Sequence, residues 1–178
     1  MIAVADLDGQ IIGLHRMKDA TVFSIDVSVA KARNVIYFSG AGRQSSELPG
    51  VPLNTAVTNR TIGFGAQPFY PPGIDFTDPG PFFPLYQFDA LHPCTQGAQP
   101  ASPYQNGIVF FPGALPLYRN GVLVGGLGVS GDGVEQDVLN MVRQRPKAPE
   151  LVINPKRGAG EGKVLLQRTG NGPHPPQS

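Results

Sequence analysis

The Asn120-Gly121 dipeptide constrains the fold more than any other feature of the sequence, because strand-forming residues flank it on both sides. Asn-Gly favours a two-residue turn with positive φ angles, and such a turn joins two adjacent antiparallel strands. Residues 115–119 precede the turn and residues 122–129 follow it. The sequence therefore predicts a β-hairpin here, with a further strand candidate at 108–111.

A second hairpin and a helix are predicted near the start of the chain. Residues 2–5 and 11–15 are short β-prone runs on either side of Asp8-Gly9, which is another turn signal. Ser24 can cap a helix that runs to about residue 39. Its apolar stripe has helical spacing and consists of Ile25, Val29, Ala32 and Ile36. Lys31 and Arg33 lie off this stripe, so we expect them to face solvent.

The two patterned regions belong to one predicted domain, residues 1–145. The chain has 23 Gly and 19 Pro in 178 residues, and many of them lie in residues 40–105 together with Phe and Tyr. We interpret this insertion as an ordered loop that covers a sheet face or a subunit interface. A further helix is predicted from Asp132, and Pro146 stops it. Residues 146–178 read as a polar, flexible tail.

Composition excludes several classes of protein. The net charge of +1 gives no basic face for phosphates, so we expect no nucleic-acid partner. No run approaches the ~20 apolar residues of a membrane span. Cys94 is the only cysteine, which excludes an internal disulfide and a cysteine zinc cage. No paired carboxylates or Ser-His-Asp order stand out, so a binding role is favoured over an enzyme.

Residues 126–131 match the G-x-G-x-x-G pattern of dinucleotide-binding loops. That motif normally follows the opening strand of a βαβ unit, whereas here it follows the return strand of a hairpin. A nicotinamide-dependent oxidoreductase is therefore the least favoured hypothesis. The alternative is that these glycines allow close packing of a strand against a helix.

The segment from His15 to Lys18 combines an imidazole, a thioether and two cations. Imidazole and thioether groups ligate haem iron, and cations pair with haem propionates. The alternative is an ordinary strand end with solvated charges.

Two blocks of the sequence resemble the GlcG/HbpS family. The first comprises residues 3–6 with Gly9, the turn 16–20 and the helix residues Ser24 and Lys31-Ala32. The second comprises Asn120-Gly121, the run 128–131 and Glu135-Gln136-Asp137. The resemblance implies a compact α/β (α+β) domain with an antiparallel sheet and flanking helices. It also implies oligomers and, in some members, haem binding that includes redox-linked sensing. The related C-terminal domain of PduO-type proteins also binds haem.

These observations favour a non-enzymatic binding domain for haem or a related tetrapyrrole. The resemblance implies Arg16, Met17 and Lys31 as cofactor contacts, and His15 is our own candidate for the iron ligand. We expect a homo-oligomer. The second hypothesis is an oligomerisation module of a larger bacterial protein, which makes its contact through the aromatic insertion.

Overall fold

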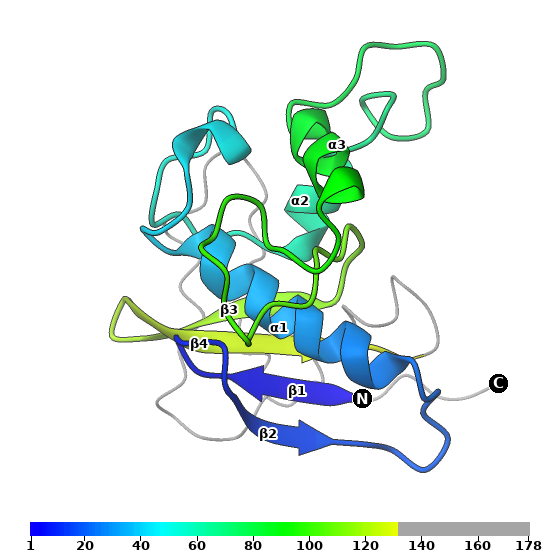
Figure 1. The fold of residues 1–178 in the computed structure, drawn as a ribbon. Coiled ribbons are helices and arrows are strands. Elements are labelled where there is room, and N and C mark those ends of the chain that lie inside the picture. The colour runs from blue at the N-terminus through cyan, green and yellow to red at the C-terminus, as the bar shows by residue number, and fades with distance from the viewer. Residues whose placement is uncertain (132–178) are drawn as a thin grey trace, which may run out of the picture.

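The computed structural model describes residues 1–131, and these form an antiparallel sheet with one long helix lying across it (Figure 1). This arrangement confirms the predicted α/β class. The elements are β1 (Ile2–Ala5), β2 (Ile11–His15), α1 (Ser24–Ser39), the short 3-10 helix η1 (Ser45–Glu47), α2 (Asn59–Gly65), α3 (Phe83–Leu91), β3 (Ala114–Arg119) and β4 (Val122–Val129). The helix expected from Asp132 and the tail 146–178 lie outside the described residues, so both stay predictions.

The sheet has the strand order β2-β1-β4-β3, with every neighbouring pair antiparallel. Both predicted hairpins are present, and the β1–β4 pair joins them. Asn120 and Gly121 have φ values of 51° and 81°, as a tight turn of this kind requires. The two ends of the described chain thus meet in the middle of the sheet.

Helix α1 covers one face of the sheet through the predicted stripe. Ala32 and Ile36 form a cluster with Ala3 and Ala5 of β1. Opposite the helix, β4 contributes glycines. A Cβ atom at Gly126 would overlap the carbonyl oxygen of Ala32, and one at Gly128 would overlap that of Ser28. This geometry confirms the close-packing interpretation of the Gly-x-Gly pattern.

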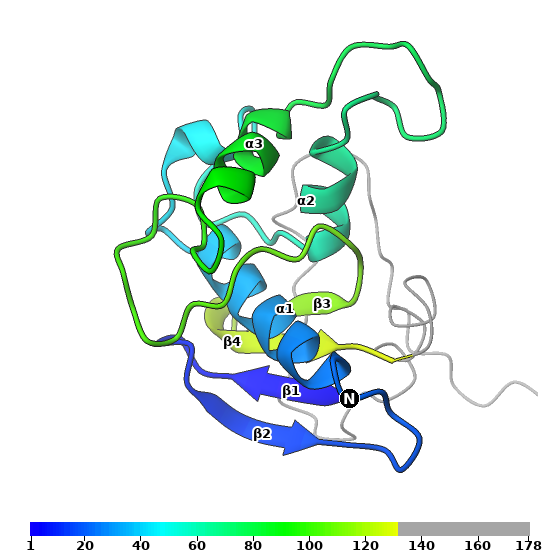
Figure 2. The ribbon, with the colours of Figure 1, turned by 45° about the vertical axis from the view of Figure 1, so that its right-hand side comes forward.

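The insertion forms a further layer on the side of α1 away from the sheet (Figure 2). Its apolar core contains Tyr37 and Phe38 from α1, Leu48, Val57, Ile62 and Ala66 from the first half of the insertion, Phe82 and Leu85 from around α3, and Ile108. The expectation that this segment covers a sheet face is therefore wrong. It covers the helix instead, because α1 presents large apolar side chains on its second face.

A buried asparagine joins α1 to the end of this layer. The Asn34 Nδ2 group donates to Gln96 Oε1 (2.7 Å) and to the Gly107 carbonyl (2.8 Å), while Oδ1 accepts from the Val109 amide (2.8 Å). Asn59 donates from Nδ2 to the Val109 carbonyl. The strand predicted at 108–111 does not form, because side-chain amides take the backbone groups that a neighbouring strand would need.

Arg43 and Glu47 hold the other end of the insertion. The Arg43 guanidinium donates to the carbonyls of Phe38 (3.1 Å), Val51 (2.6 Å) and Pro52 (3.0 Å). Glu47 accepts from the Tyr37 hydroxyl at 2.8 Å, and burial together with this hydrogen bond raises the pKa of Tyr37 above its ordinary range. These buried polar contacts fix the path of a segment that lacks long regular elements.

We predict that Gly128→Ala lowers the free energy of unfolding by about 2–3 kcal/mol, because the added methyl group must displace the backbone of α1. Gly42→Ala is the matched control, since a Cβ there meets no atom within 4 Å and the change is expected within about 0.5 kcal/mol. Urea denaturation followed by circular dichroism measures both. Equal stabilities would contradict the close packing of α1 on β4.

Candidate ligand-binding site

His15 is the last residue of β2, at the edge of the sheet. It pairs with Ile2, whose neighbour Ala3 packs against α1, so His15 lies on the opposite face of the sheet. The side chain is exposed. Within residues 1–131 its imidazole makes no hydrogen bond. The imidazole of His15 is therefore open to a ligand on this face.

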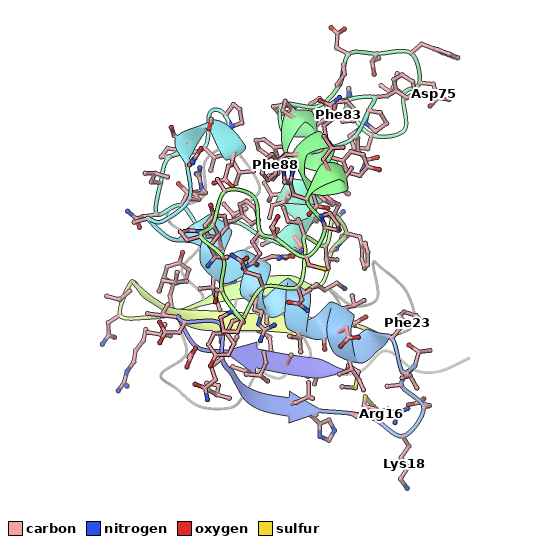
Figure 3. All side chains as sticks on the ribbon, viewed as in Figure 1. Arg16, Lys18, Phe23, Asp75, Phe83 and Phe88 are labelled. Carbon is pink, nitrogen blue, oxygen red and sulfur yellow. The ribbon has the colours of Figure 1, made fainter. Side chains whose placement is uncertain are left out.

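Arg16 and Met17 begin the loop between β2 and α1. The guanidinium of Arg16 donates from Nη2 (2.9 Å) and Nε (3.3 Å) to the carbonyl of Ala20, which closes a short turn. Figure 3 shows Arg16, Lys18 and Phe23 at one end of the molecule. Met17 is half exposed.

Exposed apolar side chains accompany these residues. Phe23 and Val22, just before α1, are 65% and 71% exposed. Leu14 on β2 is half exposed, but it pairs with Ala3 and so lies on the helix face of the sheet, opposite to His15. We call His15, Arg16, Met17, Val22 and Phe23 the β2–α1 surface. It offers an imidazole, a thioether and a guanidinium beside apolar area that has no cover among the described residues.

Lys31 lies elsewhere, and its predicted exposure is wrong. It is fully buried on α1, where Nζ donates to the carbonyl of Val129 (2.8 Å) and lies 4.8 Å from the Phe111 ring centroid. A buried ammonium group needs an acceptor such as this carbonyl. Gly128 has no side chain, which leaves room for the aliphatic part of Lys31. The structure thus brings His15, Arg16 and Met17 together but places Lys31 on the other face of the sheet.

A cavity of about 540 Å³ lies at the C-terminal end of α1, at the other end of the helix from the β2–α1 surface. It opens between the two hairpin turns and the second half of the helix. We call it the Arg33 cavity. Its walls include Leu7, Asp8 and Gly9 from the first hairpin, Arg33, Ile36, Tyr37 and Gly40 from α1 and its end, Gly42 and Asn54 from the insertion, Gln96, Gln99 and Tyr104 from the later loop, and Tyr118, Gly121, Val122 and Leu123 from the second hairpin.

Arg33 is partly buried rather than solvated as predicted. Its Nε donates to the Gly9 carbonyl (2.8 Å) and Nη1 to Asn106 Oδ1 (3.1 Å), and Cζ lies 5.6 Å from the Tyr104 ring centroid. Burial lowers the pKa of Arg33, against the opposing charge interaction with Tyr104. No pattern in the sequence indicated this cavity, because its walls come from segments scattered between Leu7 and Leu123.

We find no further binding site within the described residues, either at the Gly-x-Gly pattern or among the acidic and sulfur-containing side chains. The sides of Gly126 and Gly128 on which a Cβ atom would lie face α1, so no phosphate can approach these glycines there. Among residues 1–131, no three His, Cys, Asp or Glu side chains come close enough to hold a metal ion. No helix in the same range is long and apolar enough to cross a membrane.

The fold is that of a mixed α/β domain in which one antiparallel sheet carries a helix on its face. The family model described as haem degrading protein HbpS-like matches residues 1–143, which is most of the chain. The chain therefore belongs to the HbpS-like family, as the two sequence blocks predicted.

Individual relatives match more narrowly. A stretch of 56 residues is 43% identical to the corrinoid adenosyltransferase PduO of Citrobacter freundii, and it covers 28% of this chain and 17% of that protein. A solved PduOC:heme complex has 25% identity and a TM-score of 0.46, covering 76% of this chain and 68% of that one. Klebsiella pneumoniae protein ORFY (family model DUF336) has 23% identity and a TM-score of 0.48, covering 78% and 66%.

We predict that NAD and NADP leave the thermal unfolding midpoint unchanged, because α1 occupies the space at Gly126 and Gly128 that a pyrophosphate needs. Differential scanning fluorimetry at about 1 mM of each cofactor tests this, with a known dehydrogenase as positive control. A saturable rise of several degrees would revive the nicotinamide hypothesis.

Proposed function

We propose that this chain is a non-enzymatic binding domain for haem or a related tetrapyrrole, which it holds at the β2–α1 surface with His15 as axial ligand. The observation that carries the proposal is the exposed imidazole of His15, which makes no hydrogen bond within residues 1–131 and stands two residues from the Met17 thioether. Membership of the HbpS-like family supports haem as the ligand class.

The residues at this surface fit a haem chemically. Imidazole and thioether groups are both axial ligands of haem iron. Val22 and Phe23 offer apolar area to a macrocycle, and burying that area would stabilise the complex by about 25 cal/mol per Å². The iron would supply the redox chemistry through which such a domain senses haem or redox state.

Arg16 is the proposed partner of a propionate. Its Nε and Nη2 groups are held by the Ala20 carbonyl, whereas no described residue engages Nη1. A guanidinium fixed in this way presents its remaining donors in a defined direction, which favours a carboxylate. Lys31 stays a predicted propionate contact only if its ammonium group leaves the carbonyl of Val129.

A second copy of the chain completes the site in this proposal. The β2–α1 surface is open, and β2 is an edge strand whose outer backbone groups no other strand takes up in the described chain. A ligand bound there has one side covered by this chain and the other side free. We therefore propose a homo-oligomer that encloses the tetrapyrrole between copies.

A hemin titration tests the assignment of His15. The wild-type protein is expected to give a saturable, shifted Soret band, and His15→Ala is expected to weaken hemin binding at least about tenfold, which corresponds to about 1.4 kcal/mol. His92→Ala is the matched control, because His92 is also exposed but its Nδ1 lies 2.8 Å from the Phe88 carbonyl. An unchanged Soret band in His15→Ala would remove His15 from this role.

A structural role in assembly is the second candidate. The segment between α2 and α3 extends away from both helices in Figures 1 and 2, and Figure 3 places Asp75 in its outer part. Phe76 in this segment is 94% exposed, and Ile74 and Tyr70 are about half exposed. Aromatic side chains displayed in this way are typical of protein contacts.

If this segment joins copies of the chain, Phe76→Ser is expected to shift the molar mass in light scattering toward the monomer. Leu53→Ser is the matched control, because Leu53 is also exposed but lies outside this segment. A wild-type protein that is monomeric at all concentrations would count against both the assembly role and the enclosed tetrapyrrole site.

A further inference from the structure

We infer that the Arg33 cavity is a second binding site, which takes a small monocarboxylate with a flat apolar body. It is separate from the β2–α1 surface. The cavity touches the turn that precedes β2, whereas His15 ends that strand, and five strand residues span about 13 Å. The helix residues of the cavity likewise belong to the second half of α1, away from Phe23.

The charge of Arg33 selects an anion. The partners of its guanidinium among residues 1–131 are all uncharged, namely the Gly9 carbonyl, the Asn106 amide and the Tyr104 ring. No carboxylate among residues 1–131 forms an ion pair with Arg33. No hydrogen-bond acceptor in the same range takes up its Nη2 group. A partly buried cation without a counter-charge is costly, and a ligand carboxylate would supply both the charge and the acceptors.

The remaining walls define the body of the ligand. Ile36 and Leu123 provide apolar contacts, and the rings of Tyr104 and Tyr118 provide flat surfaces. Gln96 and Gln99 add amide groups at the same cavity, although these already pair with each other at 2.7 Å. This lining suits a planar acid better than a sugar or a nucleotide.

Asp8 limits the charge that the ligand can carry. It lines the same cavity without forming an ion pair with Arg33, so a second negative charge on the ligand would be repelled. Because Asp8 is exposed and water screens its charge, the partly buried Arg33 still attracts one carboxylate, so a monoanion is favoured. Phosphate esters and dicarboxylates are expected to bind more weakly than an aromatic monocarboxylate.

Benzoate is the probe, and benzamide is its uncharged match of nearly the same shape. Calorimetric titration of the full chain is expected to show saturable benzoate binding, with benzamide at least about tenfold weaker. Arg33→Gln is expected to abolish the preference for benzoate. Lys18→Gln is the matched control, because it removes an exposed cation that lies outside the cavity.

Arg33→Gln removes the contacts with Gly9 and Asn106 and could disturb the fold for that reason alone. A second variant, which fills the cavity and keeps Arg33, therefore completes the test. Gly42 lines the cavity, and a Cβ there meets no atom within 4 Å, so Gly42→Leu fills the space at little cost to the fold. It is expected to abolish benzoate binding and to leave the hemin titration unchanged. No saturation by benzoate up to about 10 mM, or equal binding of benzamide, would overturn the inference. So would undiminished binding to a folded Gly42→Leu protein.

Discussion

The close approach of helix α1 to strand β4 is the contact on which the rest of this structure depends. Gly126 and Gly128 lack side chains where the backbone of α1 passes, at the level of Ser28 and Ala32. Because β4 lies between β1 and β3, this contact places the helix across the middle of the sheet. The helix can then present its second face, with Phe38, to the insertion. A larger residue at either glycine position would push α1 away from the sheet. Because the insertion packs on α1, the contacts of the helix with both layers would be disturbed together.

Polar groups, more than regular secondary structure, hold the insertion against the helix. Asn34 from the middle of α1 accepts from the Val109 amide and Asn59 donates to the Val109 carbonyl, so two side chains replace the backbone partners that Val109 would have in a sheet. Arg43, just beyond the helix, donates to the carbonyls of both Phe38 and Pro52. Such buried contacts are specific in direction, since each donor left without its acceptor would cost about 1–3 kcal/mol. They explain how a segment rich in Gly and Pro follows one path.

The two proposed sites use opposite ends of the same helix and hairpin. Near Phe23, the chain displays the imidazole of His15 and apolar area at an open edge, which suits a large flat ligand completed by a second copy. Near Gly40, five separate segments of the chain enclose a cavity around the partly buried Arg33. The first site needs accessible iron ligands, whereas the second needs a cation removed from water. The two proposed sites are therefore not expected to compete with each other.

The sequence by itself determined the elements that local rules govern. The turns at Gly9 and Asn120-Gly121 require particular φ angles, and the stripe of α1 follows the helical repeat, so both hairpins and the helix could be predicted. The HbpS-like blocks and the segment His15–Met17 could be found for the same reason, because their residues are neighbours in the chain. Only the tertiary structure decided the burial of Lys31, the absence of a strand at 108–111 and the existence of the Arg33 cavity. Each of these depends on contacts between residues far apart in sequence, such as Lys31 with Val129, and no local pattern encodes such a contact.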